Sequence, residues 1–107
     1  MSKMKYEVLL PKSQAQLDTM FANLYKNNGK HLIVRIFADY LTLEDLLAVL
    51  EKNKDKIERF RRNKSLVLLT GEFNYEQIPE FVPVAPTEEE ALDVIEFEEI
   101  ERQLMSD

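Results

Sequence analysis

The residues best suited to chemistry in this 107-residue chain are its single histidine and its many carboxylates. His31 stands at the start of an apolar stretch, directly after a predicted turn. One histidine cannot build a multi-histidine metal site, and no serine or cysteine lies near it in the sequence to form a nucleophile–base pair. We therefore interpret His31 as an ordinary residue at a strand edge rather than a general base, and we predict no catalytic residue.

The chain also lacks the residues that most cofactor sites require. It has no cysteine, which excludes disulfides, zinc–thiolate sites, iron–sulfur clusters and cysteine nucleophiles. Its only glycines are Gly29 and Gly71, too few for a dinucleotide fingerprint or a P-loop. The acidic residues do not follow the spacing of a calcium-binding loop. We expect no cofactor and no metal site, and we predict that the protein is not an enzyme.

The acidic residues are concentrated at the C-terminal end. Residues 87–107 hold nine of the 20 acids but only one base, Arg102, whereas the rest of the chain is almost neutral. Such charge asymmetry is typical of a segment that binds a partner. A solvated helix face would have the same composition, so both interpretations stay open.

A basic run lies in the middle of the chain, with seven lysines and arginines between Lys52 and Lys64. Such a run would suit nucleic-acid phosphates, and the residues best placed for this alternative are Lys52, Lys56, Arg59 and Arg62. Acids are interleaved with these bases, which favours a solvated, salt-bridged helix. We therefore regard nucleic acid as the less probable partner.

Hydrophobic periodicity predicts strands that alternate with helices. The predicted strands are 6–10, 32–37 and 65–70, with a short edge strand at 81–84. The predicted helices are 13–25, one long helix that begins at Thr42 and ends at Asn63, and one from Thr87 to the end of the chain. A single helical turn is predicted at 75–78. In the last helix, the helical pattern is carried to the end by Ala91, Leu92, Ile95, Ile100 and Leu104, and a break near residues 96–97 stays open. The alternation predicts an α/β fold with a mostly parallel sheet.

Four segments carry a family resemblance: IVRIF, LLAVL, SLVLLTG and VPVAPTEEEALDVIE, within residues 30–96. Together they resemble the STAS domain family, whose best-known members are anti-sigma factor antagonists. The resemblance implies one small STAS-like α/β domain over 1–107, with its core at 31–95 and an acidic C-terminal helix at 87–105. The family's additional first strand is missing here. The implied function is protein interaction rather than catalysis.

The family's phosphorylation switch is altered in this chain. A gapless match sets TLEDL at 42–46 against the family motif Asp-Ser-(Ser/Thr)-Gly-Leu, so that the phosphorylated hydroxyl falls on Glu44. The phosphoacceptor is thus absent; a shift of that role to Thr42 stays open, and simple helix capping also explains the two acids. The partner-binding residues that the resemblance implies are Asp39, Tyr40, Thr42, Glu44 and Asp45.

The ending IEFEEIERQL resembles short STAS-like proteins from Bacteroidetes that are often labelled ribonuclease Z. That activity needs a His-x-His-x-Asp-His metal motif, which one histidine cannot supply, so we reject it. An accessory role beside an RNA-processing enzyme, binding RNA or the enzyme through the basic helix at 52–64, remains the alternative function.

The location is expected to be cytoplasmic. No apolar run approaches the ~20 residues that span a bilayer, and the start MSKMKYEV lacks the apolar core of a secretory signal. The lack of cysteine fits a reducing compartment. We therefore expect no membrane contact, while no pattern in the sequence indicates an oligomeric state.

Overall fold

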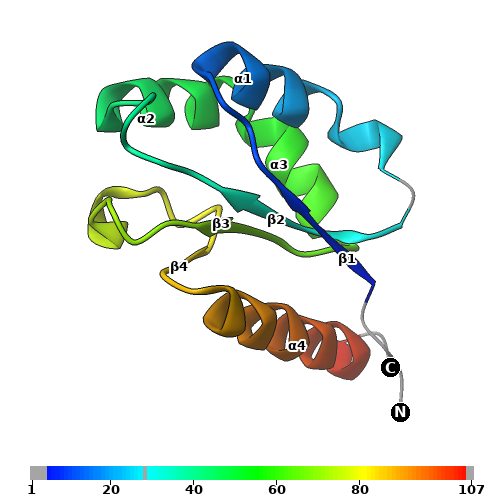
Figure 1. The fold of residues 1–107 in the computed structure, drawn as a ribbon. Coiled ribbons are helices and arrows are strands. Elements are labelled where there is room, and N and C mark those ends of the chain that lie inside the picture. The colour runs from blue at the N-terminus through cyan, green and yellow to red at the C-terminus, as the bar shows by residue number, and fades with distance from the viewer. Residues whose placement is uncertain (1–4, 28, 106–107) are drawn as a thin grey trace.

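A computed structural model of the protein, which describes residues 5–27 and 29–105, contains one four-stranded sheet with helices on both faces (Figure 1). The strands are β1 (Tyr6–Leu9), β2 (His31–Arg35), β3 (Leu66–Leu69) and β4 (Val84–Ala85). They lie in chain order, and each neighbouring pair is parallel. The α/β class and the parallel sheet are thus confirmed. The predicted domain limits at residues 1 and 107 lie outside the described residues.

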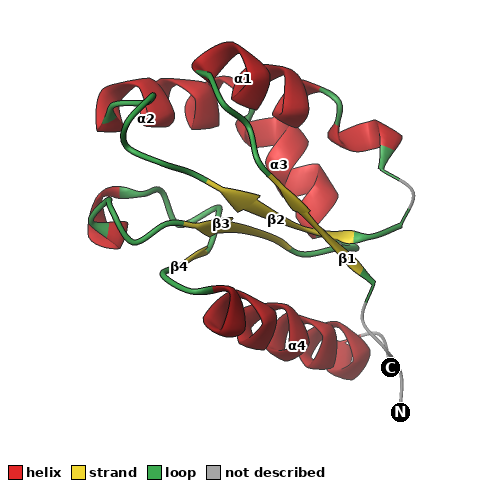
Figure 2. Ribbon diagram, viewed as in Figure 1, coloured by secondary structure: helices red, strands yellow, loops and turns green. Residues whose placement is uncertain are grey.

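The helices divide unequally between the two faces of the sheet (Figure 2). One face is covered by α1 (Gln14–Ala22), α2 (Leu43–Lys52) and α3 (Lys54–Arg61), and the other by α4 (Glu88–Met105) alone. Within the described residues, no helix has both the length and the apolar character that a membrane crossing needs.

Side chains that alternate along the interior strands fill two cores. Leu32 and Val34 of β2 point toward α1, α2 and α3, whereas Ile33 points toward α4. On the second face, Ala91 and Ile95 of α4 complete the smaller core. Both β2 and β3 are apolar almost throughout because both of their faces are covered, as the sequence predicted.

The prediction of one long helix from Thr42 to Asn63 is wrong, because the helix is interrupted at Asn53. This residue is buried, and its side-chain Nδ2 donates to the Val49 carbonyl oxygen and to Asp18 Oδ1, each at 2.9 Å. A side-chain amide that bonds to the backbone competes with regular helix bonding. The chain therefore ends α2 at Lys52 and begins α3 with a new direction.

Two smaller expectations concern the segment between β3 and β4. The helical turn predicted at 75–78 is confirmed as the 3₁₀-helix η2 (Tyr75–Gln77). The edge strand predicted at 81–84 lies further along the chain, at Val84–Ala85. Pro83 lacks an N–H, so it enters the ladder only as an acceptor, from the backbone N–H of Leu68 at 2.9 Å.

Candidate functional site

The segment that follows β2 lies at the carboxyl end of the parallel sheet, where α/β folds usually place their ligands. Arg35 and Phe37 are exposed there, and the Arg35 guanidinium lies 5.2 Å from the centre of the Phe37 ring. They line a cleft of about 560 Å³ together with Leu10, Asp39 and Tyr40. Two of the five predicted partner-binding residues therefore share one cleft.

The other three predicted residues begin α2. Thr42 Oγ1 accepts a hydrogen bond from the backbone N–H of Asp45 at 3.1 Å, which makes Thr42 the N-cap of the helix. Glu44 is exposed and Asp45 is half-buried in the first turn, where the helix dipole favours both carboxylates. The helix start predicted at Thr42 is thus confirmed. Burial raises the pKa of the Tyr40 hydroxyl above its ordinary value.

The C-terminal half of α4 has an inverted pattern of polarity. The predicted helix is confirmed and continues to Met105 without the break near 96–97, yet its apolar residues Phe97, Ile100 and Leu104 are 63%, 50% and 73% exposed. Their spacing of three and four residues places them on one side of the helix. We call these three residues the outer stripe of α4. The side of this half-helix that faces the protein carries Glu98 and Arg102 instead.

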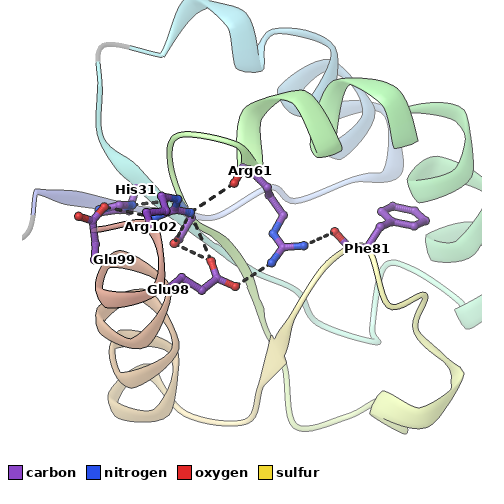
Figure 3. Close-up of polar contacts among 7 residues, drawn as sticks. His31, Arg61, Phe81, Glu98, Glu99 and Arg102 are labelled. Atoms are coloured by element: carbon purple, nitrogen blue, oxygen red, sulfur yellow. Dashed lines mark hydrogen bonds and ion pairs between the residues drawn. The ribbon is translucent and has the colours of Figure 1, made fainter. Parts of the chain in front are cut away.

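A polar network joins α4 to the rest of the molecule (Figure 3). Glu98 accepts hydrogen bonds from Arg61 Nη2 of α3 and from Ser65 Oγ, both at 2.7 Å. Arg102 Nη2 lies 3.0 Å from the same Ser65 oxygen, and Arg61 Nη1 donates to the carbonyl oxygen of Phe81 at 2.8 Å. Because these bonds satisfy polar groups that are half-buried, the polar residues can face inward and the apolar ones outward.

His31 belongs to the same network and is only 3% exposed. Its Nδ1 accepts a hydrogen bond from the backbone N–H of Ser65 at 2.9 Å, and its Nε2 lies 3.0 Å from Glu99 Oε1 (Figure 3). Burial lowers the pKa of His31, against the opposing effect of Glu99. His31 is therefore a buried residue that joins two strands and α4, which its place in the sequence did not indicate.

A second cleft, of about 610 Å³, lies between α3 and the 3₁₀-helix η1 (Leu24–Lys26), and we call it the basic cleft. The lining residues that matter for its chemistry are Leu24, Tyr25, Lys56, Arg59, Phe60 and Lys64. Only two of the four predicted nucleic-acid residues line it. Of the other two, Lys52 pairs with Asp18 at 2.9 Å, and Arg62 is exposed elsewhere.

The interpretation of the basic run as a solvated, salt-bridged helix is confirmed for α3 in one respect, since Lys54, Lys56 and Arg59 are exposed, but the only ion pair described for a base of this helix is that of Arg61 with Glu98. Among the described residues, neither Asp55 nor Glu58 forms an ion pair with a base of this helix. The basic side chains that point away from the protein core are thus left without acidic neighbours in direct contact, apart from Lys52.

Comparisons with protein-family models, with curated proteins and with solved structures found no match to this chain. Within residues 5–27 and 29–105, no group of three or more histidine or carboxylate side chains is placed to hold a metal ion.

Proposed function

We propose that the protein is a non-enzymatic, cytoplasmic protein-interaction domain, which binds a partner protein through the outer stripe of α4. The single observation that carries this proposal is the exposure of Phe97, Ile100 and Leu104 on one side of the helix. Isolated exposed apolar residues are ordinary, but contiguous ones are typical of interaction sites.

The energetics favour covering the outer stripe. Full burial of a side chain of this size stabilises by about 1.5–3 kcal/mol, and the helix that presents the stripe is already held in place by the polar network. A partner would therefore dock on a preformed surface and would not pay the cost of ordering it.

The charges around the outer stripe indicate the chemistry of the partner. Asp93, Glu96 and Glu101 are exposed on the same helix, so the stripe has an acidic border. A partner that is complementary in charge to the outer stripe has an apolar patch bordered by lysines or arginines. A second copy of this chain would bring the same acids against each other, which argues against self-association through this surface.

The resemblance to STAS domains implies a further surface at the hinge, from Asp39 to Asp45. The exposed Arg35 and Phe37, and the cleft they share with Asp39, support this part of the proposal. The hinge follows the end of β2, whereas the outer stripe lies near its start, where His31 meets Glu99. The two surfaces can therefore be tested separately.

The alternative function, an accessory role in RNA processing through the basic helix, has less support. Lys52 is engaged with Asp18, and Arg62 does not line the basic cleft. The four cations that would contact RNA phosphates are thus not arranged along one continuous track.

The experiment that tests the proposal is site-directed crosslinking in the native host. A photoreactive benzoylphenylalanine at position 100 is expected to capture a partner whose contact region is apolar with a basic border. The double substitution Phe97→Ser with Leu104→Ser should abolish capture, while the matched control Tyr75→Ser, an exposed aromatic residue elsewhere, should leave it unchanged.

Two results would contradict this assignment. Capture of only a second copy of the chain would show that the outer stripe is a self-association surface. The binding surface would instead be assigned to the hinge if Glu44→Lys or Asp45→Lys abolished capture of the partner while the α4 double variant retained it fully.

A further inference from the structure

The basic cleft differs in charge from the rest of this acidic protein. The chain has a net charge of −6, yet Lys56, Arg59 and Lys64 all line this one cleft, and none of its described lining residues is acidic. Among the described residues, the side chains of these three bases form neither an ion pair nor a hydrogen bond. Clefts lined by charge of one sign concentrate ligands of the opposite sign.

The walls of the basic cleft are apolar and aromatic. Of the lining side chains, Leu24 is buried, Phe60 is half-buried, and Tyr25 is 78% exposed. Lys26 Nζ lies 5.7 Å from the centre of the Tyr25 ring, which adds a fourth positive charge near the opening. An exposed tyrosine ring offers a stacking surface for a flat molecule.

The size of the cleft suits a small molecule rather than a polymer. Its volume of about 610 Å³ lies within the range of small-molecule sites, roughly 300–1,000 Å³. The bases converge on one hollow, and neither Lys52 nor Arg62 extends them into a track along α3. A nucleic-acid groove would need such a track to follow the phosphates.

We infer that the basic cleft binds a small aromatic anion, that is, a planar ring that carries a phosphate or a carboxylate. The ring lies against Tyr25 and Phe60, and the anionic group lies toward Lys56, Arg59 and Lys64. This site is independent of the proposed protein-binding function, because α3, which lines the cleft, lies on the opposite face of the sheet from α4 (Figure 1).

The test measures binding of four matched probes at low salt by calorimetry. 1-Naphthyl phosphate has both the ring and the charge; 1-naphthol lacks the charge, inorganic phosphate lacks the ring, and dodecyl phosphate replaces the ring by an aliphatic chain. We expect 1-naphthyl phosphate to bind at least about tenfold more tightly than each of the other three.

Variants of exposed residues then assign the site. Tyr25→Ala is expected to weaken binding of 1-naphthyl phosphate about tenfold, as for the loss of one aromatic stack, and Arg59→Ala should weaken it by a similar factor through the loss of a charge-assisted contact. The matched control is Arg62→Ala, an exposed arginine nearby that does not line the cleft, and it should leave binding unchanged. Circular dichroism of each variant checks the fold.

Three results would overturn the inference. One is the absence of binding by 1-naphthyl phosphate in folded protein. Another is equal or tighter binding of dodecyl phosphate, which would replace the aromatic ligand by an aliphatic one. The third is tighter binding of single-stranded RNA that Arg62→Ala weakens as much as Arg59→Ala, since this would extend the site along α3.

Discussion

At the scale of single residues, His31 shows how a buried base can make the fold sensitive to acid. Burial holds the pKa of His31 below its usual value of 6.5. The groups that act on it are Glu99 and Glu98, which raise the pKa, and Lys64 and Arg102, which lower it. Burial outweighs the carboxylates, so the folded protein keeps the imidazole neutral.

The first prediction follows from this shift. Below about pH 6.5 the unfolded chain takes up a proton that the folded protein resists, so the free energy of unfolding should fall as the pH decreases from 6.5. Well above that pH, where the imidazole is neutral in both states, the histidine contributes no slope. Urea denaturation at several pH values between 5.5 and 7.5 would measure how the free energy of unfolding depends on pH.

The control for this prediction is His31→Asn, which keeps an acceptor near the Ser65 backbone N–H and removes the titrating group. Because His31 is the only histidine, the slope between pH 5.5 and 6.5 should be smaller in this variant. Equal slopes in both proteins would contradict the assignment.

Asn53 carries the second prediction. Asn53→Ala removes the bonds to Val49 and Asp18, so we expect it to lower the free energy of unfolding by about 1–3 kcal/mol. Lys52→Ala also loses a contact with Asp18, but an exposed one, and should cost less than about 1 kcal/mol. Chemical denaturation of both variants measures the difference, and equal effects would show that Asn53 is not what fixes the junction between α2 and α3.

At the scale of elements, α4 is made of two halves that attach in different ways. Its first half packs through Ala91 and Ile95, whereas its second half is held by Glu98 and Arg102. The apolar side chains of the two halves lie on different sides of the helix. At about 100° per residue, Ile100 lies roughly 140° around the helix from Ile95.

The third prediction tests this division. The double substitution Phe97→Ser with Leu104→Ser should change the free energy of unfolding by less than about 0.5 kcal/mol for each site, because both side chains are exposed. Glu98→Ala should cost about 2 kcal/mol or more, since it removes the carboxylate that accepts from both Arg61 Nη2 and Ser65 Oγ. Urea denaturation gives both values; a larger loss in the double variant would mean that the outer stripe supports the fold.

At the scale of the whole molecule, the sequence predicted the parts of the fold that depend on local pattern. The buried runs of β2 and β3 and the helix cap at Thr42 are visible in the residues themselves. Their alternation with helices is enough to predict a parallel sheet.

The remaining features depend on residues that are distant in the sequence. The break at Asn53 involves Asp18, which lies 35 positions away, and the role of His31 involves Ser65, 34 positions away. The hydrophobic periodicity of the sequence does not predict such contacts. The cations of the basic cleft could be predicted from the sequence as a basic run, but the aromatic side chain of Tyr25 reaches the cleft only through the packing of η1 on α3. In contrast, the sequence alone was enough to predict that Ile100 and Leu104 lie on a different side of the helix from Ile95.

The agreement between strand order and chain order has a consequence for how the protein assembles during synthesis. Each new strand can dock on the one made just before it, and none has to insert between two that are already paired. Of the helices described here, α4 leaves the ribosome last, and it covers Ile33 and Val67 on the second face of the sheet. Until then this face stays open to solvent and to chaperones, so the nascent chain is most vulnerable to aggregation just before residues 88–105 emerge.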